Sequence, residues 1–124
     1  MGLDMYVFKA KAKPKTKVDF DCGDDDPEVF YWRKHPDLHG WMEKLYRKHK
    51  GEDDEFNGSC LLLEEQDLSD LEAALEDGSL PRTSGFFFGS SYGDEDELKR
   101  DLGFIAKARE AIADGCHLYY FPSW

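Results

Sequence analysis

The sequence lacks any hydrophobic run that approaches the length of about 20 residues needed to cross a bilayer. Its N-terminus also lacks the basic and apolar blocks of a signal peptide, so we expect a cytoplasmic protein without membrane contact. Cysteine is scarce: Cys22, Cys60 and Cys116 are widely spaced, and none belongs to a Cys-x-x-Cys pair. The odd number and the spacing predict reduced, buried thiols, and argue against a disulfide framework and a structural zinc site.

Motifs of common catalytic and phosphate sites are missing as well. The chain contains no Gly-x-Gly-x-x-Gly, Gly-x-x-x-x-Gly-Lys-Ser/Thr or Gly-x-Ser-x-Gly pattern, so it gives no support to a dinucleotide site, a P-loop or a nucleophile elbow. Cys116 and His117 are neighbours in an expected strand, so their side chains point to opposite faces and cannot act as a pair. We therefore predict no cofactor and no catalytic residue, and a small enzyme is the least favoured hypothesis.

The chain is instead rich in aromatic and acidic residues. Of its 124 residues, 40% are hydrophobic and 15% are aromatic, which predicts one folded domain over residues 1–124 with an aromatic core. The formal net charge is -11, from 27 acidic and 16 basic residues. This charge repels the phosphates of DNA and is compatible with a basic partner, although solubility alone also accounts for it.

Two kinds of side chain alternate over residues 4–17, as they do in a strand. The side expected to face the core holds Tyr6, Phe8, Ala10 and Ala12. The side expected to face solvent holds Lys9, Lys11, Lys13 and Lys15. Lysines at every second position, with Pro14 among them, are typical of an edge strand that avoids pairing with other chains. The alternative is a row of lysines that contacts phosphate groups.

The remaining hydrophobic patterns predict an α+β fold. Short apolar runs indicate strands, and stretches with apolar residues at steps of three and four indicate amphipathic helices. Gly51, Gly78 and Gly115 are expected to end the helices, and Asp67 to cap the second one. The expected strands lie at 4–17, 29–32, 59–63 and 116–121, and the expected helices at 36–50, between 67 and 78, and between 94 and 115. Together they predict a small, mostly antiparallel sheet with about three amphipathic helices packed on one face.

Acidic residues crowd the expected loop at residues 19–28, which suggests a calcium site. An EF-hand loop needs a ligand at its fifth position and glycine at its sixth, but Gly23 is fifth and Asp24 sixth when the count starts at Asp19. His35 and His39 are four residues apart, but Pro36 disfavours helical dihedrals at the residue before it, so these histidines need not share a helix face. We therefore predict no metal site.

Large rings stand beside cationic groups in the segment that leads into the first helix. This group comprises Tyr31, Trp32, Arg33, Lys34, His39 and Trp41. Such rings can stack on a nucleobase or on another planar ligand. A strand that enters a helix also buries rings of this kind in the core, and this alternative stays open.

Three segments of the chain share a pattern with known proteins. They are Met1-Gly-Leu-Asp-Met-Tyr6, Tyr31-Trp-Arg-Lys34 with Leu38, His39 and Trp41, and Pro81-Arg-Thr-Ser-Gly-Phe-Phe-Phe-Gly89. Together they resemble a family of small proteins of bacteriophages and prophages. The resemblance touches most of the chain and implies stoichiometric binding that blocks host nucleic-acid machinery or immune effectors. It implies no catalytic residue.

These patterns support two hypotheses about function. The first is non-catalytic binding to a host protein or nucleoprotein complex with a basic surface, for example as an anti-CRISPR or other anti-defence inhibitor, with no direct DNA binding. Its expected contact residues are Asp24, Asp25, Asp26, Asp53, Asp54, Glu55, Asp94, Glu95, Asp96 and Glu97. The second is capture of a small ligand such as a nucleotide or a signal molecule. Its expected pocket residues are Tyr31, Trp32, Arg33, His39, Arg82, Thr83 and Ser84.

Overall fold

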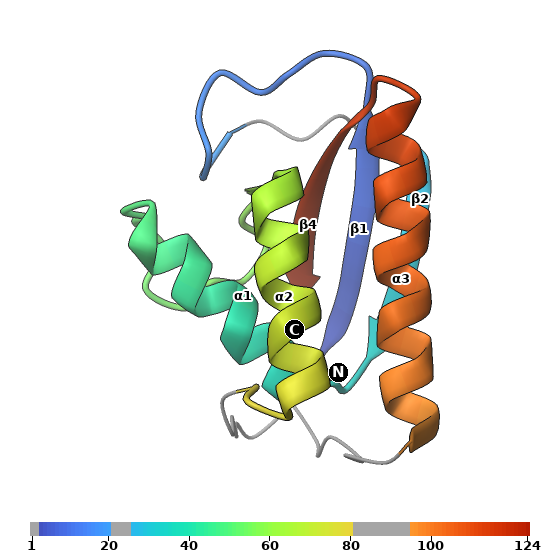
Figure 1. Ribbon diagram of the computed structural model, residues 1–124. Helices are drawn as coiled ribbons and strands as arrows, with labels where there is room; N and C mark the ends of the chain where they lie inside the picture. The colour runs from blue at the N-terminus through green and yellow to red at the C-terminus, as the bar shows by residue number, and fades with distance from the viewer. Residues whose placement is uncertain (1–2, 21–25, 81–94) are drawn as a thin grey trace.

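The computed structural model describes residues 3–20, 26–80 and 95–124 (Figure 1). The elements have the order that the hydrophobic patterns predict. They are β1 (Asp4–Ala10), β2 (Glu28–Arg33), α1 (Pro36–Lys48), β3 (Leu61–Leu63), α2 (Glu65–Asp77), α3 (Glu95–Ala113) and β4 (His117–Ser123).

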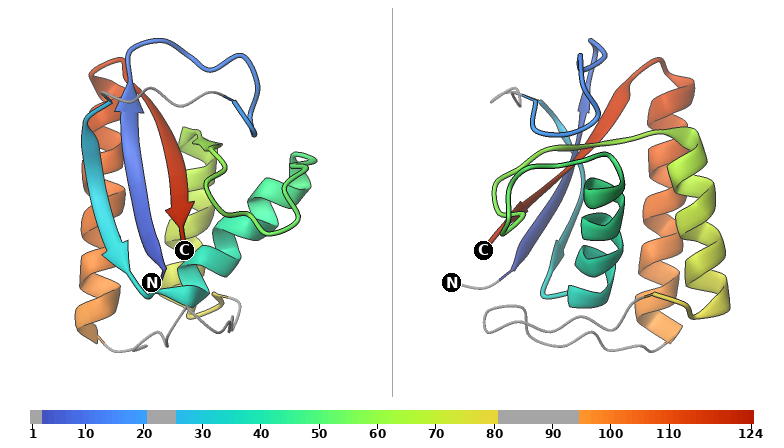
Figure 2. Two further views of the ribbon diagram at one scale, coloured as in Figure 1. Left: turned by 180° about the vertical axis from the view of Figure 1, so that it is seen from behind. Right: turned by 90° about the vertical axis from the view of Figure 1, so that its left-hand side faces the viewer.

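The four strands form one antiparallel sheet in the order β2-β1-β4-β3. The three helices pack on the same side of this sheet (Figure 1), and none of the described helices covers its other side (Figure 2). The α+β prediction is confirmed. The uncovered side, called here the open side of the sheet, is where the candidate site lies.

The core fills the space between the sheet and the helices. Each strand places alternate side chains there, and each helix adds one apolar stripe. The sheet supplies Met5, Val7, Trp32, Leu61, Leu63, Leu118 and Tyr120, and the helices supply Leu38, Met42, Leu45, Tyr46, Leu68, Leu71, Leu75, Phe104, Ile105 and Ala108. Burying each of the large apolar side chains contributes about 1.5–3 kcal/mol, so this layer is the main source of stability.

The prediction for the first strand is wrong in two respects. β1 lies between β2 and β4, so it is an inner strand and not an edge strand. Its buried side holds Met5 and Val7, whereas Tyr6 and Phe8 lie on the open side and are half-buried. Met5 and Val7 on one side of the strand and Tyr6 and Phe8 on the other are all apolar. The alternation of lysines after Phe8 therefore predicted the wrong side of the strand as the one that faces the core.

The lysine segment also does not continue the strand. β1 ends at Ala10, and residues 11–20, called here the arch, cross over β4 to the outer edge of β3 (Figure 2). There Val18 forms a β-bridge with Leu61, and the Leu62 N–H donates to the Lys17 carbonyl oxygen at 2.8 Å. The arch therefore encloses space over the end of the sheet.

Helix boundaries differ from the expected ones by a few residues. α1 ends at Lys48, and the left-handed residue after it is Lys50 (φ 65°), not Gly51. In α2, Glu64 is the N-cap, and Asp67 accepts from the Glu64 N–H at 2.8 Å in a capping box. Gly78 ends α2 with φ 66°, as predicted.

Gly51 is required for a different reason, namely the close approach of a ring. A Cβ atom at this position would lie 2.2 Å from Cζ of Tyr46. The Tyr46 side chain is fully buried, and its hydroxyl donates to Asp19 and accepts from the Asp53 N–H at 2.8 Å. The ring therefore has little freedom to move away.

We expect Gly51→Ala to lower the free energy of unfolding by about 1–3 kcal/mol, because the added methyl group overpacks this contact. The control is Gly103→Ala in α3, where a Cβ atom meets nothing within 4 Å. That change should raise stability by about 0.5–1 kcal/mol, since alanine favours a helix over glycine. Urea unfolding measures both, and equal effects would contradict the overpacking argument.

The two described cysteines differ in their state. Cys60 is buried and disulfide-bonded, so the prediction of reduced thiols is wrong for this residue. Cys116 is free and half-buried, and Cys22 lies outside the described residues.

Among the helices described, none has the length and apolar character to cross a membrane.

Candidate functional site

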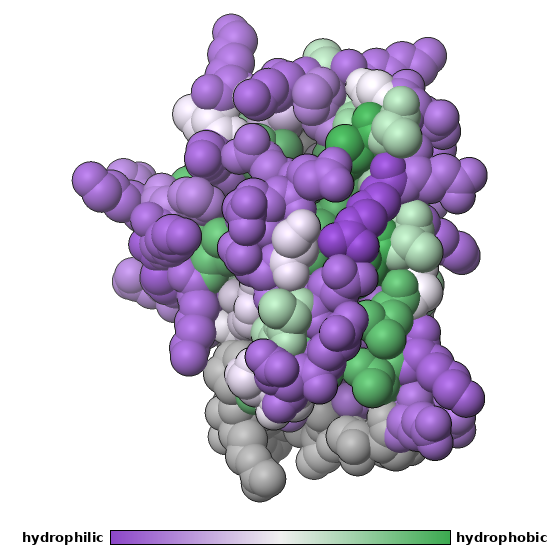
Figure 3. Space-filling view, viewed as in Figure 1, coloured by the Kyte–Doolittle hydropathy of each residue, from purple (hydrophilic) through white to green (hydrophobic). Residues whose placement is uncertain are grey.

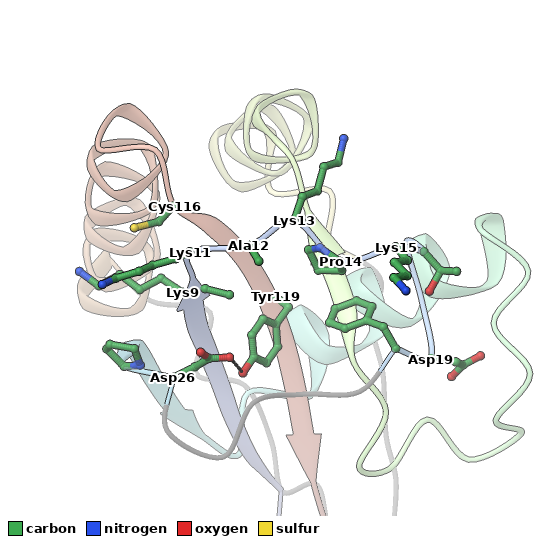
Figure 4. Close-up of a pocket in the computed structure, with 14 residues that line it drawn as sticks. Lys9, Lys11, Ala12, Lys13, Pro14, Lys15, Asp19, Asp26, Cys116 and Tyr119 are labelled. Carbon is green, nitrogen blue, oxygen red and sulfur yellow. Dashed lines mark hydrogen bonds between the residues drawn. The ribbon is translucent and has the colours of Figure 1, made fainter.

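A hollow of about 1060 Å³ lies under the arch, next to the ends of β1 and β4 (Figure 4). It exists because the chain leaves β1 at Ala10 and returns to the sheet only at Val18, on the far side of β4. Its described lining consists of Lys9, Ala10, Lys11, Ala12, Lys13, Pro14, Lys15, Thr16, Asp19, Phe20, Asp26, Pro27, Cys116 and Tyr119. We call it the lysine hollow.

Four lysines surround this space, and none of them forms an ion pair with a described residue. The next lysine along the chain, Lys17, does form one, with Glu64 at 3.3 Å. In Figure 4, Lys9 and Lys11 extend in the same direction, Lys15 lies on the other side of Tyr119, and Lys13 projects away. The ammonium groups are therefore available to an anion.

The floor of the lysine hollow is the ring of Tyr119 in β4. This side chain is buried, packs edge-on against Phe20 at 5.6 Å, and donates its hydroxyl to Asp26 at 2.6 Å. Asp19, at the far end, accepts from the Tyr46 hydroxyl and from the Glu52 N–H at 2.9 Å. Asp26 and Asp19 are therefore both hydrogen-bonded to other parts of the fold and help to fix the lining of the hollow.

Aromatic side chains continue from the hollow over the open side of the sheet. Phe8 packs against Tyr119 at 5.5 Å and Tyr6 at 5.5 Å, and Tyr6 packs against Tyr31 at 5.2 Å. Phe121 lies 6.4 Å from Tyr6 and 6.3 Å from Phe8, between ring centroids. We call Tyr6, Phe8, Tyr31 and Phe121 the aromatic face.

Comparisons of the chain with protein-family models, with curated proteins and with solved structures found no match. The resemblance to small phage and prophage proteins therefore stays an expectation from the motifs. A functional assignment has to rest on the chemistry of the side chains.

A second polar group lies inside the core, between β2, the start of α1, and α3. Asp101 accepts from the Trp32 indole N–H at 2.9 Å, and its other oxygen lies 2.8 Å from Nε2 of His35. Glu97 lies 3.7 Å from the same nitrogen. His35, Glu97 and Asp101 are all buried and offer ligand atoms within 4.8 Å of one another, as a bound cation requires.

The short contacts favour a structural role for this group. At 2.8 Å the His35 and Asp101 atoms share a direct hydrogen bond, and the indole of Trp32 fixes the orientation of the carboxylate. The sequence patterns did not reveal the group, because Glu97 fitted the acidic first turn of a helix. The spacing of four between Glu97 and Asp101, on the side of α3 that holds Ile105, could have indicated it.

The acids expected to contact a partner are not equivalent. Asp54, Glu55, Glu95 and Asp96 are exposed, whereas Glu97 is buried and cannot belong to an acidic exterior. Asp24, Asp25 and Asp94 lie outside the described residues. Burial of Glu97 results from its position on the inner side of α3.

Asp26 and Asp53 are bonded within the fold. Asp26 accepts from the Tyr119 hydroxyl. Asp53 accepts from the Ser59 hydroxyl at 2.6 Å and from the N–H groups of Asn57 at 3.0 Å and Glu55 at 3.1 Å. The Ser59 hydrogen bond is the main reason that the pKa of Asp53 is lowered. Asp53 therefore shapes the loop after α1.

The residues expected to form a ligand pocket do not come together in one. Tyr31 and Arg33 lie on the open side, where Asp4 accepts from the Tyr31 hydroxyl at 2.6 Å and lies 3.8 Å from Arg33 Nε. Trp32 points the other way into the core, as strand alternation requires. Arg82, Thr83 and Ser84 lie outside the described residues.

His39 is a core residue of α1. Its Nδ1 lies 2.7 Å from the Tyr120 hydroxyl, and its ring stacks on Phe56 at 5.2 Å. Burial lowers the pKa of His39 to about 4, so the imidazole is neutral near pH 7. Of the expected pocket residues that the structure describes, Tyr31 and Arg33 lie on the open side of the sheet, and Tyr31 belongs to the aromatic face.

Proposed function

We propose that the protein is a non-catalytic binding protein that holds a phosphate-bearing small molecule, such as a nucleotide, in the lysine hollow. One observation is the main support. In a chain with a net charge of -11, four lysines surround one space without an acidic partner among the described residues. An anion bound in this space would be attracted by the positive charge of the lysines that line it.

The surroundings of the lysines favour a ligand that also contains a ring. Phe20 and Tyr119 line the hollow, and Phe8 joins Tyr119 to the aromatic face. A nucleotide has both the phosphate for the lysines and a planar base for the rings. The site would recognise such a ligand by charge and stacking, and the proposal requires no catalytic group.

The test is thermal unfolding in the presence of sodium pyrophosphate or ATP. A ligand at 100 times its dissociation constant adds about 2.7 kcal/mol to stability, so binding should raise the melting temperature. The double variant Lys9→Ala/Lys11→Ala should bind about tenfold more weakly or worse, because it removes two charged contacts. Binding should also weaken as the salt concentration rises.

The matched control is Lys44→Ala/Lys99→Ala, which removes the same charge from two exposed lysines on helices. It should leave the shift unchanged. If the control lowers the shift as much as Lys9→Ala/Lys11→Ala does, general charge explains the effect and the hollow is not the site. The absence of any shift with both pyrophosphate and ATP would refute the proposal.

The acidic exterior supports a second candidate, namely stoichiometric binding to a host protein or nucleoprotein complex with a basic surface, as an anti-defence protein of phage origin would do. α2 contains six acidic residues and no basic one in its 13 residues, and the surface that it shares with α1 is largely hydrophilic (Figure 3). Glu76→Lys/Asp77→Lys should then abolish capture of a basic partner from bacterial lysate. Capture that is unchanged by this charge reversal, or insensitive to salt, would contradict the candidate.

A further inference from the structure

We infer that the ligand is single-stranded nucleic acid, with phosphates at the lysine hollow and bases stacked on the aromatic face. This inference rests on the proposed function and extends it from a small molecule to a polymer. It differs from the expectation of no direct DNA binding, which came from net charge alone. The described lining of the hollow holds four lysines and two aspartates, so its formal charge is opposite in sign to the net charge of the chain.

Ring contacts through the buried side chain of Tyr119 connect the lysine hollow to the aromatic face. Tyr119 lines the hollow and contacts Phe8, which contacts Tyr6, which in turn contacts Tyr31, with ring centroids 5.2–5.5 Å apart at each step. The row therefore runs from the lysines across β4 and β1 to β2. A row of this kind is longer than one nucleobase, so a single nucleotide would leave part of it uncovered.

The aromatic face lies on the side of the sheet that no described helix covers (Figure 2). Tyr31 is 41% exposed, and Tyr6, Phe8 and Phe121 are half-buried. The Tyr31 hydroxyl donates to Asp4 at 2.6 Å, and this hydrogen bond raises the pKa of Tyr31 to about 12. Antiparallel sheets with exposed rings are a known way to stack two or three bases of a single strand.

Charge and geometry both favour a single strand over a duplex. A duplex keeps its bases paired and stacked within the helix, so the aromatic face cannot reach them. A duplex also has a high density of phosphates, which the net charge of -11 repels outside the hollow. We therefore expect a ten-nucleotide single strand to bind more tightly than a duplex of the same length.

The experiment measures fluorescence anisotropy of labelled ten-nucleotide oligo(dT) and oligo(U) at low salt. Both single strands should bind, and unlabelled tripolyphosphate should compete, because it occupies the lysine hollow. Tyr31→Leu should weaken binding of the oligonucleotides about fivefold to a hundredfold by removing one stacking platform. It should leave tripolyphosphate binding unchanged, as measured by calorimetry.

Two controls separate stacking from other effects. Tyr31→Phe keeps the ring and loses only the hydrogen bond to Asp4, so it should bind like the original protein. Lys9→Ala/Lys11→Ala should weaken binding of both the oligonucleotides and tripolyphosphate. A preference for oligo(U) would indicate RNA as the source, and a preference for oligo(dT) would indicate DNA.

The outcomes distinguish this inference from the proposed function. Binding of tripolyphosphate without binding of either oligonucleotide would overturn the inference and leave the proposed function standing. Equal oligonucleotide binding by Tyr31→Leu and the original protein would also overturn it. Failure of both ligands to bind would refute the two together.

Discussion

Asp101→Ala should lower the free energy of unfolding by about 3–5 kcal/mol, the largest effect that we expect from one substitution. The carboxylate is 2% exposed, and it is the common partner of the Trp32 indole N–H at 2.9 Å and of His35 Nε2 at 2.8 Å. Alanine would leave these two buried polar groups without their bonds to the carboxylate. Urea unfolding at neutral pH measures the loss.

Two further substitutions on α3 calibrate this result. Asp101→Asn keeps an oxygen that can accept from Trp32, so it should lose less stability than alanine does. Glu110→Ala removes an exposed carboxylate from the same helix and should change stability by about 0.5 kcal/mol or less. If Asp101→Ala loses as little stability as Glu110→Ala, the hydrogen bonds of Asp101 to Trp32 and His35 do not stabilise the packing of α3 against β2 and the start of α1.

The second large effect is an acid sensitivity that depends on His39. Burial lowers the folded-state pKa of this residue to about 4, whereas the unfolded chain has a value near 6.5. As the pH falls, the unfolded chain therefore takes up the proton first, and protonation favours unfolding. The stability is present in full above about pH 6.5 and declines as the pH falls toward 4, by roughly 3 kcal/mol in total.

The comparison with His39→Gln isolates this contribution. Glutamine does not titrate, so the variant should be less stable at pH 7 but should lose less stability between pH 7 and pH 4. The difference in unfolding free energy between the two proteins, measured in urea at pH 7, 5.5 and 4, should shrink by roughly 3 kcal/mol. A difference that stays constant across these pH values would show that His39 is not the group responsible.

Several elements were predictable from sequence because their signals are local. The helix from Pro36 has apolar residues at steps of three and four, and Gly78 adopts the left-handed conformation that ends α2. The closing strand was expected from its tyrosines and phenylalanines and extends over His117–Ser123. Such patterns depend only on the period of a helix or strand and on the dihedrals of single residues.

The lysine segment shows where local signals fail. An alternation of lysine and small residues fits a strand, but it contains no information on which neighbours the strand has. β1 became an inner strand because β2 and β4 pair on its two sides. The lysines left the sheet because Lys17 and Val18 pair with β3 instead of continuing along β4.

The sequence by itself determined the α+β class, the order of the elements and the apolar stripes of the helices, because backbone period and side-chain polarity act over a few residues. Only the tertiary structure decided that Tyr119, 99 positions after Phe20 in the chain, would pack against it, and that Asp101 would join His35. These contacts depend on strand order and on how α3 docks on the sheet. Pairings between distant segments compete with one another for the same space, and no local pattern records which pairing prevails.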